Sequence, residues 1–299
     1  MHTPEEPKNN PIVLIGVFSL IVLCVLGLGL VTQLDLNRQI SGRAVAAPMA
    51  PASSSTAVEP PRPRAVHRLA DHPLLTSPVR LAVATCALPA FGVSDEELSA
   101  YYTAGVACLD QTWRPALQQE NLPFDPPVLD TSPDLKDGPC GSAPAENEAV
   151  AYYCGRNRTI YMPTSRLRNN GGGERPGTHL ATLAHEYGHH VQALTGMLRA
   201  ADSKIVDAGE GTPAGLEMSR RIELQANCFA GMFLTTVSTS IGSDLAQEAA
   251  DDFQYAVEEP ADKNAHGSPD NQAEWASYGF TSGVTTSCNT YTASAEAVA

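Results

Sequence analysis

The sequence has little basic charge, with 19 Lys and Arg residues against 33 Asp and Glu residues and a formal net charge of −14. Because proteins that bind nucleic acid present basic patches to the phosphates, this balance argues against nucleic acid as a partner. The sequence also lacks any C-x-x-C pair, which argues against a zinc site built from cysteines. It contains no internal repeat. We therefore expect a single main domain with a sizeable core.

A long hydrophobic run without charge lies at residues 11–31. As an α-helix this run is about 31 Å long, which is enough to cross the hydrocarbon core of a bilayer. A cleavable signal peptide is the alternative. Its hydrophobic region is normally shorter, and the A-x-A-like run at 44–46 lies well beyond this segment. We therefore expect an uncleaved transmembrane helix.

The segments around this run define the expected domain organisation. Residues 1–10 are a short cytoplasmic tail, residues 11–31 a transmembrane helix, residues 32–75 a linker and residues 76–299 the main domain. The linker is rich in Pro, Ala and Ser, a composition that buries no core and is typical of an extended tether. The expected location is the cell membrane, with a single pass and the main domain outside the cytoplasm.

The cysteines support this location. Of 7 cysteines, all except Cys24 follow the hydrophobic run. An even number of cysteines beyond a membrane anchor is typical of disulfides in an oxidising compartment. The order of the cysteines leaves their pairing open. The pairs we expect are Cys140 with Cys154 across a hairpin, Cys86 with Cys108, and then Cys228 with Cys288.

Residues 185–190 read H-E-Y-G-H-H and contain an H-E-x-x-H motif. On an α-helix, His185 and His189 lie one turn apart on one face, so both imidazoles can bind one metal ion. Glu186 projects beside them, where a carboxylate can take a proton from a metal-bound water. Apolar residues at helical spacing predict that this helix is buried, and Gly188 indicates that another element passes close to it. The alternative is a pair of unrelated core histidines.

A catalytic zinc site needs a third protein ligand and an open position for water. The best candidate is Glu223, at the edge of the apolar side of a helix predicted over Leu216–Leu234. A buried carboxylate there needs a positively charged partner. The alternative is an ordinary surface glutamate that pairs with Arg220 or with solvent. Other carboxylates that could act as the ligand are Asp207, Glu210 and Glu217.

The run H-E-Y-G-H-H-V-Q, followed by E-L-Q-A-N-C-F-A-G, resembles the bacterial "putative neutral zinc metallopeptidase" family. Further segments match its cysteine-bearing hairpin at 140–162, a downstream helix at 252–257, and a C-terminal H-G-S motif at 266–268 followed by Trp275. The resemblance covers about residues 80–292. It implies a zincin of the gluzincin type with Zn²⁺ as cofactor. The implied ligands are His185, His189 and Glu223, and the implied general base is Glu186.

Two residues depart from the pattern of this family. Asn227 stands where the family usually has Asp. In related peptidases a carboxylate at that position accepts the N–H of a zinc-bound histidine, and the amide oxygen of Asn227 can accept the same bond without a charge. We expect a less basic histidine ligand and a slower site. Gln272 stands where the family usually has Arg, so this chain lacks a guanidinium at that position to hold the site or to bind a substrate carboxylate.

Together, these features predict a membrane-anchored, extracytoplasmic zinc metallopeptidase that acts on peptides or proteins. Glu186 would move a proton from water to the leaving amine. His266 is the candidate second donor to the oxyanion, with Tyr161 and Tyr153 as alternatives. The alternative function is a catalytically weak or silent zinc-binding domain that serves as an extracellular binding module. A structural zinc site would have no use for Glu186. Hydrolysis of cell-wall peptides would require the same chemistry.

The expected fold class is α+β, mainly helical, with a zincin-like domain and a small β-hairpin. The hairpin is expected over residues 149–154 and 158–162, where by analogy with zincins it would hold a substrate backbone in extended form. The segment 123–144 is rich in loop-forming residues. The predicted helix starts are a capping box at Ser94-x-x-Glu97, Ser243, and Ser268-Pro269.

Overall fold

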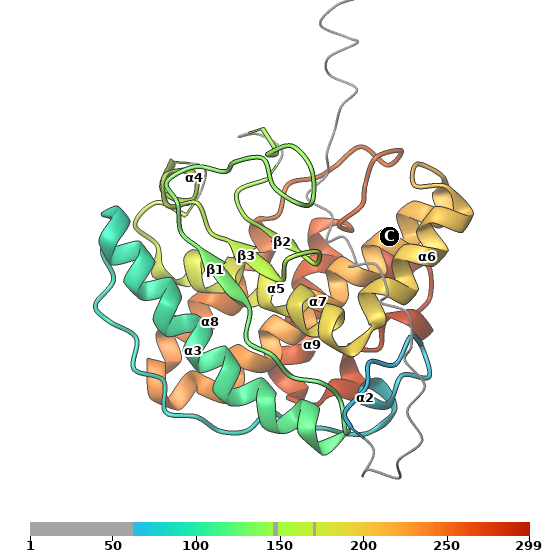
Figure 1. Cartoon of the computed structure of the whole chain (residues 1–299), viewed down its shortest axis with the longest axis horizontal. Helices are drawn as coiled ribbons and strands as arrows, with labels where there is room; N and C mark the ends of the chain where they lie inside the picture. The colour runs from blue at the N-terminus through green and yellow to red at the C-terminus, as the bar shows by residue number, and fades with distance from the viewer. Residues whose placement is uncertain (1–61, 146–148, 170–171) are drawn as a thin grey trace, which may run out of the picture. The chain divides into compact units, whose positions relative to one another are not determined.

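The computed structural model describes residues 62–145, 149–169 and 172–299. Within these ranges the chain is mainly helical and has one small sheet, which confirms the predicted α+β class (Figure 1). The predicted transmembrane segment at 11–31 lies outside the described residues. None of the helices in the described ranges combines the length and the apolar character that a membrane span requires.

The sheet contains three short strands in the order β1-β3-β2. Strands β2 (Tyr152–Cys154) and β3 (Thr159–Tyr161) form the predicted antiparallel hairpin, although both are shorter than expected. Strand β1 (Val128–Asp130) pairs parallel with β3 and was not predicted. It lies in the segment that appeared to be loop only, because three residues after two prolines are too few to show an alternating pattern.

Eight helices of the described chain are α-helices, and most begin at a recognisable signal. The capping box of Ser94 and Glu97 is present at the start of α3, and α5, α7 and α9 each begin with proline. The predicted helix at 216–234 is part of the longer α7. The bounds are α2 Pro73–Thr76, α3 Asp95–Gln119, α4 Thr164–Asn169, α5 Pro176–Thr195, α6 Met197–Ala208, α7 Pro213–Ile241, α8 Ser243–Asp251 and α9 Pro269–Ser282.

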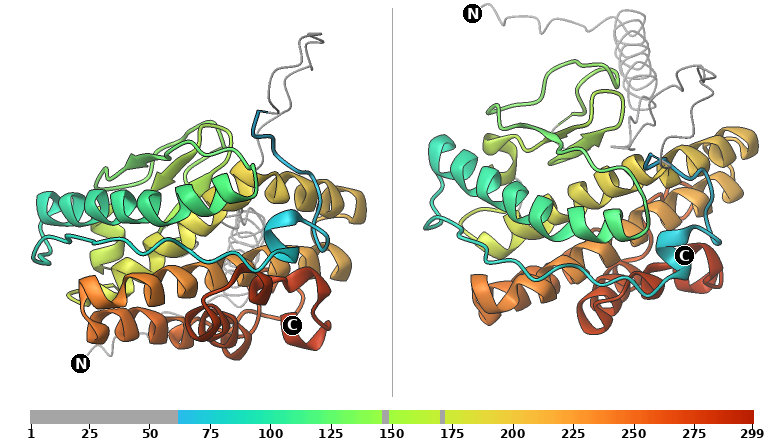
Figure 2. Two further views of the ribbon diagram at one scale, coloured as in Figure 1. Left: turned by 90° about the horizontal axis from the view of Figure 1, so that it is seen from below. Right: turned by 60° about the horizontal axis from the view of Figure 1, so that its bottom comes forward.

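Helix α5 lies at the centre of this arrangement. It contacts β2 and β3 as well as α7 and α8, while α7 and α9 pack along each other. Both views in Figure 2 show the green sheet and the orange and red C-terminal helices on opposite sides of the domain. Four 3₁₀ turns, at 252–255, 285–288, 290–292 and 296–298, complete the C-terminal part.

Three disulfides are present in the described part of the chain, and they are the three predicted pairs. Cys86 is bonded to Cys108, Cys140 to Cys154, and Cys228 to Cys288. The last disulfide joins α7 to the 3₁₀ turn at 285–288. As a result, the C-terminal segment is fixed against the middle of α7.

The folded domain begins earlier than the expected boundary at residue 76. Leu69, Leu74 and Leu75 are buried in the main core, and the N–H of Val66 donates to the carbonyl oxygen of Thr195 over 2.7 Å. The assignment of residues 32–75 to a linker therefore fails for its last ten or so residues. The boundary was placed too late because the Pro-rich composition of the whole segment outweighed the three leucines, which pack against the domain.

Candidate metal centre

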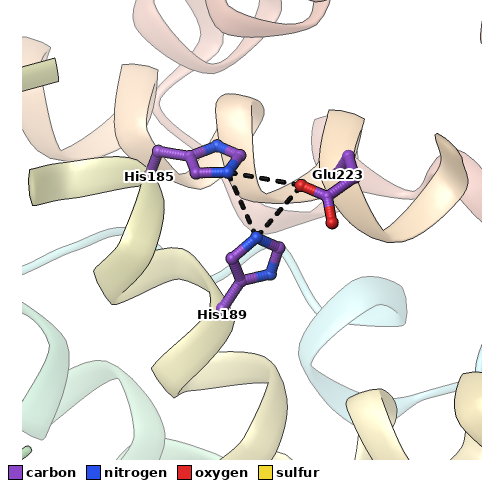
Figure 3. A group of neighbouring side chains, drawn as sticks. All are labelled: His185, His189 and Glu223. Carbon is purple, nitrogen blue, oxygen red and sulfur yellow. Dashed lines mark hydrogen bonds and ion pairs between the residues drawn. The ribbon is translucent and has the colours of Figure 1, made fainter. Parts of the chain in front are cut away.

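The H-E-x-x-H motif lies on α5, as predicted. Its apolar neighbours Leu183, Ala184 and Tyr187 are buried against the core, so the opposite face of this turn directs the two histidines toward α7. Figure 3 shows His185 and His189 on one helix and Glu223 on another, with all three side chains pointing toward one another. The structure thus brings together the three residues that the family resemblance implied as ligands.

The three candidate ligand atoms form a nearly equilateral triangle. His185 Nε2 and His189 Nε2 are 3.1 Å apart, and Glu223 Oε2 lies 3.1 Å from His189 Nε2 and 3.3 Å from His185 Nε2. Zinc binds such atoms at about 2.0–2.2 Å with tetrahedral angles, which places neighbouring ligand atoms about 3.3 Å apart. The donor set and its spacing therefore fit a zinc ion.

Burial and charge also favour a cation at this place. The side chains of His189 and Glu223 are only 2% and 7% exposed. Burial alone would raise the pKa of Glu223, but the charge of His189 and hydrogen bonds from both histidines hold this pKa well below its usual value. A carboxylate that stays ionised while buried needs a positive partner. Zn²⁺ would supply that charge.

The other candidate ligands lie elsewhere. Asp207 and Glu210 are exposed, and Glu217 forms an ion pair with Arg221 over 2.7 Å. Arg220, the alternative partner of Glu223, donates instead to the carbonyl oxygens of Val298 and Asn264. The surface ion pair considered for Glu223 is therefore not formed.

Each histidine has an amide partner on its second ring nitrogen. His185 Nδ1 lies 2.6 Å from Asn227 Oδ1, the contact expected for this position. His189 Nδ1 lies 2.9 Å from Gln192 Oε1. Sequence reasoning missed Gln192, although its position three residues after His189 on the same helix was a usable signal. Such outer hydrogen bonds orient a ligand histidine and select its tautomer.

Glu186 lies next to the triangle and lines the same cleft. It is buried, and burial raises its pKa against the opposing influence of the two histidines. The expected role of Glu186 does not require a direct hydrogen bond to His185, His189 or Glu223, because a general base acts on a water that lies between it and the metal. Its placement matches the position that the motif predicts.

His266 lines this cleft as well, on the segment before α9. Its Nδ1 lies 2.9 Å from Glu259 Oε1, a partner that the sequence did not reveal. Burial alone would lower the pKa of His266, but the hydrogen bond with Glu259 and the charge of Glu223 raise it to about 9. The carboxylate of Glu259 thus favours the protonated form of His266, whose ring lines the cleft.

The tyrosines named as alternatives to His266 are not at this place. The hydroxyl of Tyr153 bonds to His190, and the hydroxyl of Tyr161 accepts a hydrogen bond from Asn157. Neither lines the cleft. Gln272, which replaces the usual Arg of the family, does line it, and its amide donates to the carbonyl oxygen of Gly267 over 2.9 Å. Gln272 thus supports the turn that carries His266.

The cleft around these residues has a volume of about 800 Å³. One wall is residues 149–151, which lead directly into β2, and another includes Phe253, Tyr255 and Val257. Tyr255 and Val257 are 66% and 81% exposed, so apolar side chains border the opening. A space of this size and lining suits part of a peptide. A second cleft of similar volume, between α6 and α7, contains none of the metal-site residues.

Comparisons with known proteins agree with this geometry. The model of a family described as "Putative neutral zinc metallopeptidase" matches residues 82–291. An uncharacterized protein of Mycobacterium tuberculosis is 30% identical over 183 residues, which are 51% of this chain and 59% of the relative. The uncharacterized protein YpfJ of Escherichia coli K12 is 26% identical over 215 residues, 66% of this chain and 73% of the relative. The chain thus spans only about three fifths of the mycobacterial relative. No solved structure matches it.

Proposed function

Since the chain belongs to the putative neutral zinc metallopeptidase family, we propose that it is a zinc-dependent peptidase that hydrolyses peptide bonds in the cleft beside α5. The observation that carries this proposal is the triangle of His185, His189 and Glu223, whose sides of 3.1–3.3 Å suit tetrahedral zinc, with Glu186 in the same cleft. When bound, zinc supplies a Lewis acid that activates water and polarises a carbonyl group.

Glu186 acts as the general base in this proposal. A carboxylate whose pKa is raised by burial accepts a proton from water and can release it again to the leaving amine. Because Glu186 does not bind the metal, the proposal separates its role from that of the three ligands. Glu186→Gln should therefore keep the metal and lose activity.

His266 stabilises the oxyanion that develops on the scissile carbonyl. Glu259 holds its Nδ1 and favours its protonated form, and the ring lines the cleft. A preorganised donor of this kind typically contributes about 10²–10³-fold in rate. In the proposed reaction, His266 therefore acts only after the substrate is bound, and its loss should lower kcat more than it raises KM.

The substrate would lie along the edge strand of the sheet. Strand β2 is an edge strand, and residues 149–151 before it line the cleft. An extended peptide can add to such an edge through backbone hydrogen bonds. The carbonyl oxygens of Pro144 and Ala149 accept hydrogen bonds from the buried guanidinium of Arg166, which supports this wall of the cleft.

The test uses purified protein, a library of fluorogenic peptides and metal analysis of the same samples. The account predicts cleavage by the zinc-loaded wild type, and zinc retention with a loss of at least about 10²-fold in rate for Glu186→Gln. An alternative function as a silent zinc-binding module predicts equal behaviour of both proteins. Full cleavage by Glu186→Gln would contradict the mechanism.

We further propose that the domain acts outside the cytoplasm, anchored by residues 11–31. The support is the uncharged run itself and the three disulfides that follow it, since disulfides are typical of oxidising compartments. The domain should be found in the membrane fraction of untreated cells. Protease treatment of intact cells should then remove it. Protection until lysis would contradict this location.

A further inference from the structure

We propose that Gln192 and Gln225 form a directional hydrogen-bond relay that fixes the tautomer and the ring orientation of His189, with Nε2 toward the metal. Both side chains are fully buried, and neither lines the cleft. They are positioning residues that act through His189. The proposal rests on the zinc site proposed above, but not on peptidase activity.

The amide of Gln192 can adopt only one orientation. Its Nε2 lies 2.8 Å from the carbonyl oxygen of Ile222. Because a carbonyl oxygen only accepts hydrogen bonds, the atom that faces it must be the NH₂ group. The amide oxygen of Gln192 is therefore the atom 2.9 Å from His189 Nδ1. An amide oxygen also only accepts, so Nδ1 must carry hydrogen, and Nε2, which lies 3.1 Å from Glu223 Oε2, is the nitrogen that gives up its proton when a metal binds.

Gln225 fixes the same orientation from the other side. Its Oε1 accepts from the second N–H of Gln192 over 3.1 Å. Its own Nε2 lies 3.1 Å from the carbonyl oxygen of Cys288, which again can only accept. Cys288 is bonded to Cys228. The relay therefore runs from a disulfide-fixed backbone carbonyl through two amides to the imidazole.

Reversing the relay would be costly. A flipped Gln192 would place its NH₂ group against the N–H of His189 and its oxygen against the oxygens of Ile222 and Gln225. Three hydrogen bonds would be lost in a fully buried place, where unsatisfied polar groups destabilise the fold. The other ligand histidine lacks such anchoring. No residue that the structure describes bonds to the amide nitrogen of Asn227, the partner of His185.

The measurement is the affinity for Zn²⁺ alone, by competition with a chromogenic chelator, for three variants. Gln192→Leu removes the acceptor, and we expect a loss of about 10–100-fold in zinc affinity. Gln192→Glu gives Nδ1–H a carboxylate acceptor but loses both donors, so we expect a zinc affinity at least equal to that of the wild type together with a less stable metal-free fold. Gln225→Leu should weaken zinc binding by about 3–10-fold, because only one anchor of Gln192 is removed.

The pattern distinguishes positioning from a purely structural role. If the amides only stabilise the core, Gln192→Glu should be at least as harmful to zinc binding as Gln192→Leu. The controls are Thr112→Val, which removes a buried hydrogen bond to Leu109 in α3, and Gln247→Leu, which removes a surface bond to Asp251 in α8. Both should bind zinc like the wild type. If Gln192→Leu does not fold, the zinc affinities of Gln192→Glu and Gln225→Leu still distinguish the positioning role from the structural role.

An NMR spectrum of the imidazole nitrogens of the zinc-loaded wild type shows independently which nitrogen of His189 is protonated and which binds zinc. We expect the ring of His189 to be protonated at Nδ1 and bound to zinc through Nε2. Zinc bound through Nδ1, or wild-type affinity in Gln192→Leu, would overturn the proposal while leaving the metal site intact. A wild type that binds no zinc would overturn the metal site itself.

Discussion

Gly188 of α5 faces Ala226 of α7 so closely that a Cβ on residue 188 would lie 2.9 Å from the Ala226 Cα. This contact occurs between His185 and His189 along one helix, and between Glu223 and Asn227 along the other. The two helix backbones can therefore approach only because residue 188 has no side chain. The same approach sets the distance between the histidines and Glu223.

Gly188→Ala should therefore weaken both the fold and the zinc site. Alanine favours an isolated helix by about 1 kcal/mol over glycine, but overpacking at a helix crossing typically costs about 1–3 kcal/mol. We expect lower thermal stability and a loss of at least about tenfold in zinc affinity. Calorimetry and chelator competition measure the two effects. The control is Gly211→Ala, where an added Cβ would meet nothing within 4 Å. Unchanged zinc binding by Gly188→Ala would show that this crossing does not set the site.

Glu223→Ala should remove most of the bound zinc. Two histidines alone hold zinc weakly in an open site, and the variant loses the carboxylate that lies 3.1 Å from His189. The matched control is Glu217→Ala on the same helix, which breaks only the ion pair with Arg221. Metal content after dialysis measures the result. One tightly retained zinc per chain in Glu223→Ala would refute the ligand assignment.

Asn227→Asp should keep the zinc and raise its affinity or the rate of hydrolysis. A carboxylate that accepts the N–H of His185 makes this imidazole a stronger ligand than the present amide does. Such outer changes typically alter affinity or activity by about 10–100-fold. Zinc titration and steady-state kinetics on one peptide measure the change. A large loss of zinc in Asn227→Asp would mean that Asn227 has another role.

The stability of the protein should fall as the pH decreases from 6.5 to about 4. Burial lowers the pKa of His72 and of His190 from 6.5 to about 4. In this interval the unfolded chain binds protons that the folded state excludes, so folding stability decreases as pH falls through the window and is fully present above pH 6.5. Each histidine contributes roughly 3 kcal/mol of this loss.

Denaturant titrations at several pH values test this prediction. His72→Asn and His190→Gln should each lower stability at pH 7, and their difference from the wild type should shrink as the pH approaches 4. The exposed His67 provides the control substitution, His67→Asn. If the free energy of unfolding changes with pH in the same way for the wild type and for the two variants, the lowered pKa values do not belong to His72 and His190.

The sequence predicted those parts of the fold that depend on local patterns. The capping box of Ser94, the proline at the start of α9 and the hairpin all follow from neighbouring residues. Strand β1 could not be predicted, because only its pairing with β3 makes it a strand. Helix α6 was missed because Gly196 separates it from α5 by a single residue.

The candidate site divides in the same way. The two histidines and Glu186 follow from one helical motif. Glu223 was the best candidate from its place on a predicted helix, and the family resemblance strengthened that assignment. The partners of the histidines depend on how helices pack. Gln225 acts through Gln192 on another helix, and Glu259 meets His266 through an irregular turn. Neither contact has a fixed spacing in sequence that could have indicated it.

The most direct test of the account is a crystal structure of the zinc-loaded protein with anomalous data at the zinc edge. We predict one zinc ion bound by His185, His189 and Glu223, with its fourth position open to the cleft beside Glu186. A fourth protein ligand that closes this position, or zinc bound at a place without these residues, would contradict the proposed peptidase.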